Sequence, residues 1–188
     1  MIEEFEVKGP HEEVLEGEGA GRGFNNRVAV LTAIMATIGA LFSYNASFTL
    51  GEAIMWKNEA SIKKTEASDQ WNFFQSKSNK LNIAELSAKL TTGKDHDESK
   101  NNVQRYDAEK KEIQKNAERI EKLAHEADLR SEKFLATHNL WSPGTTLLQI
   151  AISLAAMALL MTRKWLLYGS LTCAAVGIGF GIMAWLGL

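Results

Sequence analysis

Long apolar windows alternate with one long, highly charged segment along this chain. Three windows, 28–51, 139–162 and 165–188, each hold 24 residues without a single Asp, Glu, Lys or Arg. A helix of that length spans about 30 Å of hydrocarbon, because each helical residue adds about 1.5 Å. Each window therefore predicts a membrane-spanning helix.

The bounds of these spans follow from their flanking residues. We expect transmembrane helices over 24–51, 141–162 and 165–188, with a turn at 163–164. The first span is the most polar of the three, so a secretory signal peptide is its obvious alternative. Residues 1–23, however, carry seven acids and two bases, whereas a signal peptide begins with a short basic region. We therefore predict that residues 1–23 form an acidic, glycine-containing flexible tail.

The charged segment predicts a long helix that leaves the membrane. Residues 52–137 hold sixteen acids and sixteen bases, with no proline and Gly93 as the one glycine. Small or apolar residues recur at every seventh position in a line formed by Gly39, Ala46, Ala53, Ala60, Ala67, Phe74, Leu81 and Ala88. This spacing is typical of a coiled coil and predicts one continuous helix from about Asn26 to about Leu90.

The same spacing predicts a second helix that returns to the membrane. A turn is expected near 91–96, where Asp95 and Glu98 match a capping box, and Pro143 predicts a break or kink before the second span. We therefore predict an antiparallel helical hairpin over 52–140. Its seam is expected at Ala67, Trp71, Phe74, Leu81, Tyr106, Ile113, Ala117, Ile120, Ala124, Ala127 and Phe134.

Overall composition conceals this organisation. The 188 residues are 45% hydrophobic and 23% charged, with a formal net charge of -2, and such averages describe an ordinary soluble domain. One cysteine excludes an internal disulfide framework, and the near-zero charge argues against a nucleic-acid partner. The placement of the charges instead predicts an all-α membrane protein, with three transmembrane helices and a coiled-coil hairpin between the first and second.

No residue pattern predicts catalysis, a metal site or a cofactor. His96 lies between Asp95 and Asp97, but consecutive residues cannot all point at one ion, and a helix cap already explains the acids. Cys173 lies within the third span without a partner cysteine. We expect a protein that is not an enzyme and holds no cofactor, with a metal or redox role at His96 as an alternative to be tested.

Basic residues near the spans predict the orientation. Arg22 and Arg27 precede the first span, and Arg163 and Lys164 form the turn between the second and third. Basic residues concentrate on the cytoplasmic side, and three spans place these two positions on the same side. We therefore predict a cytoplasmic N-terminus and a periplasmic hairpin.

Small residues on the spans predict close packing of helices. They lie at Ala29, Thr32, Ala36, Gly39, Ser43 and Ala46 in the first span, and at Gly177 and Gly181 in the third. Small side chains let helices approach closely in lipid. Two interpretations remain open: packing of the three spans within one chain, or self-association of the first helix with its copies.

Four segments resemble a known family. They are GPHEEVLE at 9–16, NRVAVLTA at 26–33, KNEA at 57–60 and KTEASDQW at 64–71. They are similar to the bacterial membrane proteins catalogued as domain of unknown function 4337, and the likeness extends over nearly the whole chain. The resemblance implies a bacterial inner-membrane protein with this three-span layout, and it implies no activity and no catalytic residue.

These observations favour an anchoring or assembly role. We expect an integral membrane scaffold or accessory subunit, embedded in membrane lipid, that self-associates through its spans and presents the hairpin to another membrane protein complex. A homo-oligomeric channel lined by Thr32, Ser43 and Ser47 is the alternative, although no ring of charges predicts ion selectivity.

Overall fold

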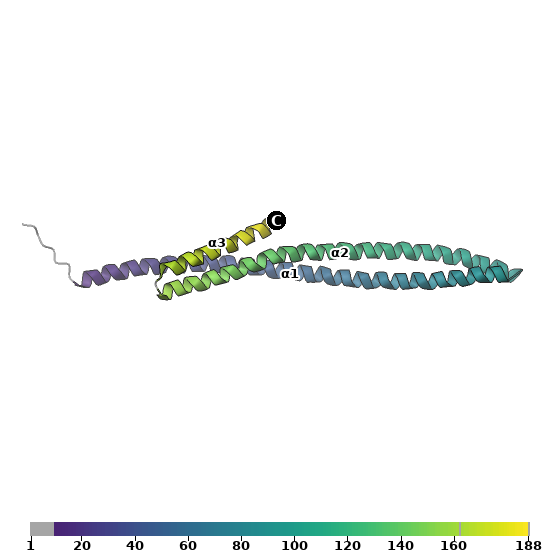
Figure 1. Ribbon diagram of the computed structural model, residues 1–188, viewed down its shortest axis with the longest axis horizontal. Coiled ribbons are helices and arrows are strands. Elements are labelled where there is room, and N and C mark those ends of the chain that lie inside the picture. Colours follow the sequence, from purple (N-terminus) through teal and green to yellow (C-terminus); the bar gives the residue numbers. More distant parts are fainter. Residues whose placement is uncertain (1–9, 162, 188) are drawn as a thin grey trace, which may run out of the picture. The chain divides into compact units, whose positions relative to one another are not determined.

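The chain is all-helical over the part that the structure describes. The computed structural model describes the backbone of residues 10–161 and 163–187, and the side chains of residues 23–161 and 163–187. This part forms α1 (Pro10–Leu90), α2 (Lys94–Met161) and α3 (Lys164–Leu186), without a strand (Figure 1). Each helix contains an apolar window long enough to cross a membrane. The expected helical fold with three long apolar segments is confirmed.

The first helix begins earlier than the sequence predicted. We expected a flexible tail over 1–23, but α1 begins at Pro10, so residues 10–23 belong to the helix, and residues 1–9 lie outside the described part. Proline suits the first helical position because its missing N–H has no helical partner there. This local preference outweighs the glycines of the segment.

The turn between α1 and α2 is tighter than expected. It occupies residues 91–93, and Gly93 has a positive φ of 69°, which glycine adopts without a steric penalty. The backbone N–H groups of His96 and Asp97 both donate to the Gly93 carbonyl. Asp95 therefore lies inside the first turn of α2, and the predicted capping box is wrong. The acids there still favour the helix dipole.

Helix α2 continues through Pro143 without a break. Of the predicted break or kink at Pro143, the break is therefore wrong, because no helix end lies there. Two threonine hydroxyls on the C-terminal side of Pro143 donate to backbone carbonyls: Thr145 Oγ1 to Trp141 O at 3.0 Å and Thr146 Oγ1 to Ser142 O at 3.1 Å. Pro143 has no N–H to donate to the carbonyl of Asn139 four residues earlier, and contacts with neighbouring helices allow proline inside apolar helices.

The connection between α2 and α3 is also short. Helix α2 ends at Met161 and α3 begins at Lys164. Arg163 is the residue before α3 and has an extended backbone, with φ of -98° and ψ of 113°. The turn predicted at 163–164 is thus shifted by one residue, because Lys164 already belongs to α3, and Thr162 lies outside the described residues.

The chain divides into two compact units. We call residues Met1–Thr49 with Ala136–Leu188 the bundle unit, and residues Leu50–Leu135 the hairpin unit. The bundle unit contains segments of all three helices, whereas the hairpin unit contains only α1 and α2. Within the hairpin unit these two helices run antiparallel and side by side (Figure 1).

Small residues dominate the core of the bundle unit. Its buried cluster consists of Val28, Met35, Leu148, Ala151, Ala155 and Ala174. Helix α3 contributes one face, because its buried residues follow a spacing of three or four, namely Leu166, Ser170, Ala174, Gly177, Gly181 and Ala184. This periodicity places them on one side of a helix. The buried Ser170 hydroxyl donates to Ala151 O of α2 at 2.6 Å.

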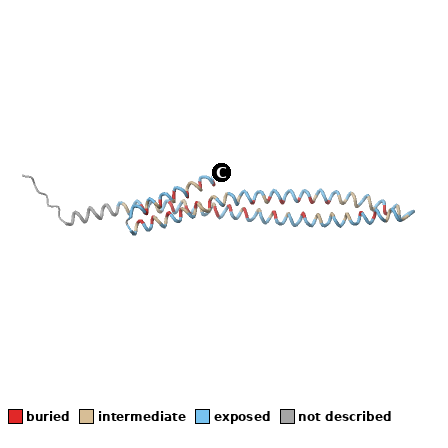
Figure 2. The backbone as a smooth tube through the Cα atoms, viewed as in Figure 1, coloured by how far each residue is buried: buried red, intermediate tan, exposed pale blue. Residues whose placement is uncertain are grey.

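Alanine forms the centre of the hairpin unit. Ala60 of α1 is 1% exposed, and Ala117 and Ala124 of α2 are 0% and 1% exposed. Buried residues recur along the sides of α1 and α2 that face each other, whereas the outer sides are exposed (Figure 2). The short alanine side chain allows the two backbones to lie close together.

Candidate functional site

The small residues predicted to pack helices lie on two different faces. Gly39, Ala46, Gly177 and Gly181 are buried inside the bundle unit. The remaining predicted residues are exposed or half-buried, with Ala29, Ala36 and Ser43 exposed and Thr32 between the two classes. The buried set therefore makes contacts within the chain. The chain leaves the other set uncovered, so that set is available for self-association.

The buried set brings backbones into direct contact. A Cβ atom added at Gly177 would lie 3.0 Å from Gly144 O and 3.2 Å from Leu147 Cβ. A Cβ atom at Gly181 would overlap the Phe42 ring. Phe42 in turn packs edge-on against Trp141, with 5.0 Å between the ring centroids. These glycines therefore serve packing within one chain.

The uncovered set forms a continuous face of α1. We call Ala29, Ala33, Ala36, Ala40, Ser43 and Ser47 the small-residue face; all six are exposed. They alternate in steps of four and three, so they repeat every seven residues and lie on one side of the helix. Ala33 was missed among the predicted residues, although it shares its seven-residue spacing with Ala40 and Ser47, and that spacing could have found it.

Hydroxyl groups next to this face are bonded within their own helix. Thr32 Oγ1 donates to Val28 O at 2.8 Å, and Thr37 Oγ1 donates to Ala33 O at 3.0 Å. Each acceptor is the carbonyl four residues earlier, so the threonine hydroxyl need not find a partner in another helix or in water. Neither threonine therefore has an unpaired hydroxyl donor.

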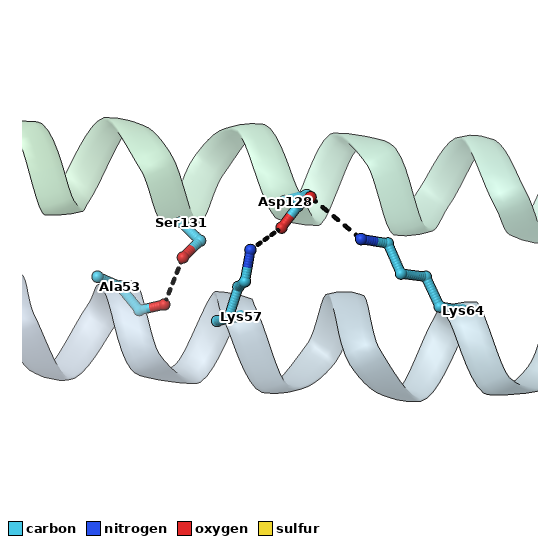
Figure 3. A network of polar contacts seen from close by, with 5 residues as sticks. All are labelled: Ala53, Lys57, Lys64, Asp128 and Ser131. Atoms are coloured by element: carbon cyan, nitrogen blue, oxygen red, sulfur yellow. Dashed lines mark hydrogen bonds and ion pairs between the residues drawn. The ribbon is translucent and has the colours of Figure 1, made fainter.

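A charged and hydroxyl network joins the two helices of the hairpin unit (Figure 3). The Asp128 carboxylate of α2 accepts from Lys57 Nζ at 2.7 Å and from Lys64 Nζ at 3.2 Å, both on α1. These lysines lie two helical turns apart, so Asp128 lies between them. The buried Ser131 hydroxyl donates to Ala53 O of α1 at 2.7 Å. The network fixes which residues of α2 face which residues of α1.

These contacts also shift proton affinities. The hydrogen bonds from Lys57 and then Lys64 lower the pKa of Asp128, and the same Asp128 bond raises the pKa of Lys57. In the middle of the hairpin unit, Lys77 Nζ lies 2.5 Å from Glu109 Oε2, and this hydrogen bond lowers the pKa of Glu109. Each shift favours the charged form of the group, because an opposite charge is its hydrogen-bond partner.

Helix contacts keep one seven-residue register. In the hairpin unit, Ser131 contacts Ala53, and Lys110 Nζ lies 5.2 Å from the centre of the Phe74 ring. At its far end, His96 Nδ1 lies 2.7 Å from Ala88 O. Ala53, Phe74 and Ala88 of α1 are separated by multiples of seven residues. Their partners on α2, Ser131, Lys110 and His96, are separated in the same way. His96 thus contacts a backbone carbonyl at the turn.

The predicted seam residues lie along these facing sides. Those buried are Ala67, Leu81, Ile113, Ala117, Ile120, Ala124 and Ala127. Those half-buried are Trp71, Phe74, Tyr106 and Phe134. Aromatic side chains thus lie at the edge of the alanine seam, where their larger volume extends beyond the narrow space between the backbones. Trp71 and Phe74 contact each other edge-on, with 5.5 Å between centroids.

The residues predicted to set the orientation lie at the surface of the bundle unit. Arg27, Arg163 and Lys164 are exposed. The side chain of Arg22 lies outside the described residues. No group of three or more His, Cys, Asp or Glu side chains is suitably placed for a metal ion within the described ranges.

Comparison with known proteins connects this architecture to one family. The model of the family described as "Domain of unknown function (DUF4337)" matches residues 24–187. No curated protein and no solved structure matches the chain.

Proposed function

The chain belongs to the DUF4337 family, and from its structure we propose a non-enzymatic integral membrane scaffold or accessory subunit that self-associates through α1. The observation that carries this proposal is the small-residue face, which the chain's own helices leave exposed. In lipid, helix association is driven by close packing, because the solvent is as apolar as the side chains. A face of Ala and Ser allows two α1 helices to approach more closely than faces of Leu or Phe.

The proposal places the bundle unit in the bacterial inner membrane. Three apolar helices of sufficient length support this location. Arg27, Arg163 and Lys164 support a cytoplasmic N-terminus, because basic residues concentrate on that side. The hairpin unit then lies on the periplasmic side.

The hairpin unit is proposed to act as a coiled-coil rod for protein partners. Its seven-residue register and its alanine seam support this geometry. Its outer surface offers both charged groups and isolated apolar side chains, such as Ile62 and Phe73, which are 53% and 49% exposed.

Substitution of the small-residue face tests self-association. Ala36→Leu and Ala40→Leu add bulk that separates the helices, so we expect the detergent-purified protein to change from an oligomer to a single chain by mass photometry. Ala175→Leu, at an exposed alanine of α3, is the matched control and should leave the mass unchanged. A wild-type protein of single-chain mass with no copurifying partner would contradict the proposal.

A cysteine crosslink tests the same contact in native membranes. Cys173→Ser removes the native thiol, and Ala36→Cys then places one thiol on the small-residue face. We expect an oxidant to join two chains through Ala36→Cys and to join few through Ala175→Cys. Equal crosslinking at both positions would indicate random collision instead of a specific contact.

A channel remains the second candidate because Ser43 and Ser47 are exposed on the small-residue face. Planar-bilayer recording of the purified protein tests it, and Ser43→Leu should block any conductance that passes along this face. Gly39 is unsuitable for this test, because it is buried beside Leu148 and a leucine there would disturb packing within one chain. Absence of conductance in the wild type would remove this candidate.

A further inference from the structure

The charged side chains of the bundle unit are all basic within its described residues. They are Arg27, Arg163 and Lys164, and all three are exposed. None of them forms an ion pair with another described residue. This differs from the hairpin unit, where lysines such as Lys57 and Lys77 are paired with carboxylates. Three exposed cations therefore lie in the described part of the bundle unit, whereas residues 1–23 of the same unit carry seven acids and two bases in the sequence.

These basic residues gather at one end of the bundle unit. Arg27 precedes Val28, which lies in the buried cluster. Leu159 of α2 and Leu167 of α3 pack against the same cluster, and Arg163 and Lys164 lie between them in the sequence. The N-terminal part of the α1 segment thus meets the connection between α2 and α3.

A shallow, open apolar groove on the surface of α1 begins beside Arg27. It has a volume of about 360 Å³ and is lined by Asn26, Arg27, Val30, Leu31 and Ile34. Val30 and Ile34 are 61% and 52% exposed, so their apolar side chains are open to a ligand. The groove shares no residue with the small-residue face, so one copy of α1 could contact another chain and a ligand at once.

Aromatic side chains lie at the same end. Trp165 and Tyr168 of α3 are 69% and 67% exposed. Such amphipathic rings are typical of the level of lipid headgroups, where one edge contacts acyl chains and the other contacts water. The end of the bundle unit therefore combines cations, a groove of apolar side chains and exposed aromatic rings.

We infer that this end of the bundle unit binds an anionic phospholipid, with its phosphate at Arg27 and an acyl chain along Val30 and Ile34. A guanidinium group can donate two parallel hydrogen bonds to a phosphate. Arg163 and Lys164 attract a headgroup with net negative charge. A zwitterionic lipid has no net charge, so these residues increase its affinity less. The inference rests on the proposed membrane location of the bundle unit and is independent of self-association.

Native mass spectrometry of the full-length protein tests the inference. The protein in detergent is mixed with phosphatidylglycerol or with phosphatidylcholine of the same acyl chains, and the bound fraction is compared. Each basic residue near a membrane surface contributes enough for about a fivefold change in affinity. We therefore expect Arg27→Gln to reduce phosphatidylglycerol binding about fivefold and to affect phosphatidylcholine less.

Two controls separate the site from general attraction. Lys100→Gln removes an exposed charge of the hairpin unit and should leave lipid binding unchanged. Arg163→Gln combined with Lys164→Gln should reduce the preference for phosphatidylglycerol. Glycerol phosphate, which has the phosphate but no acyl chains, should bind weakly. Binding of glycerol phosphate as strong as that of the lipid would overturn the role of the groove.

Flotation with vesicles distinguishes the failures of the two proposals. A protein that floats with vesicles but shows no preference for phosphatidylglycerol, or keeps its preference in Arg27→Gln, overturns the lipid site and leaves the membrane location intact. A protein that does not float with vesicles of either lipid overturns both. A preference that is lost in Arg27→Gln and kept in Lys100→Gln supports the site.

Discussion

The bundle unit and the hairpin unit both pack their helices through small residues, but they differ in how close the packed groups lie. In the bundle unit, glycines allow a backbone or a ring to occupy the space of a side chain, as at Gly177 and Gly181. In the hairpin unit, alanines separate the backbones, and ion pairs such as Lys57 with Asp128 lie at the flank. The comparison shows that steric fit sets how the helices pair in the apolar unit. In the charged unit, steric fit and polar contacts together set the pairing.

The largest effect is expected at Gly181. Gly181→Ala would place a methyl group within the Phe42 ring and force Phe42 away from Trp141. Overpacking of this kind costs about 1–3 kcal/mol, and we expect the upper end because an aromatic ring must move. The measurement is thermal unfolding in detergent, followed by circular dichroism.

A neighbouring glycine provides the control for this prediction. A Cβ atom at Gly179 meets nothing within 4 Å, so Gly179→Ala should change stability by less than about 0.5 kcal/mol. Equal destabilisation by both substitutions would mean that loss of glycine itself matters, and the proposed fit against Phe42 would be wrong.

A smaller effect is expected at the alanine seam. Ala60→Leu adds three carbons at a position that is 1% exposed, and it should cost about 2 kcal/mol because the two backbones must separate. Ser61→Leu, at the exposed next position, should change little. Hydrogen exchange of the hairpin unit measures both, and faster exchange in Ser61→Leu than in Ala60→Leu would contradict the assigned faces.

The smallest effect is expected from the charged network. The folded-state pKa of Asp128 is lowered, so its contribution to stability is present above the ordinary aspartate pKa of about 4. That contribution is lost as the pH falls from about 4 through the lowered folded-state pKa. Glu109 changes in the same direction. Because these groups are at the surface, we expect a modest fall in melting temperature at acid pH.

Substitution of Asp128 isolates its part of this pH dependence. Asp128→Asn removes the titrating group, so the melting temperature should fall less steeply with acid than in the wild type. Asp69→Asn, an exposed acid of the same unit, should keep the wild-type slope. If both variants keep it, the network of Figure 3 contributes nothing measurable to stability.

The sequence predicted the helices well because their signals are local. Windows without charged residues and the seven-residue spacing indicated α1, α2 and α3, and the predicted end near Leu90 agrees with the end of α1. Helix starts were predicted less well. Pro10 begins α1 where glycines and acids suggested a tail, and Gly93 precedes α2 where Asp95 suggested a cap. In both cases the residues favoured two different positions for the start of the helix, and composition alone did not show which position the chain adopts.

The faces of α1 could not be assigned from sequence. Ala36 and Ala46 are the same residue in the same span, yet Ala46 is buried and Ala36 is exposed. The difference comes from α2, which brings His138 to within 2.8 Å of the Ala46 carbonyl from 92 residues away in the chain. Periodicity shows that a helix has a small face, but it does not show which partner covers that face.

By itself, the sequence determined three long apolar helices, a charged helical segment between the first two, and the seven-residue spacing of its seam, because these depend on residue type and local order. Tertiary structure alone decided that α2 continues through Pro143, that Ser131 meets Ala53, and that the small residues of α1 divide into a buried and an exposed set. Burial and helix contacts depend on which distant segment packs against a residue, and the local sequence pattern does not determine that segment.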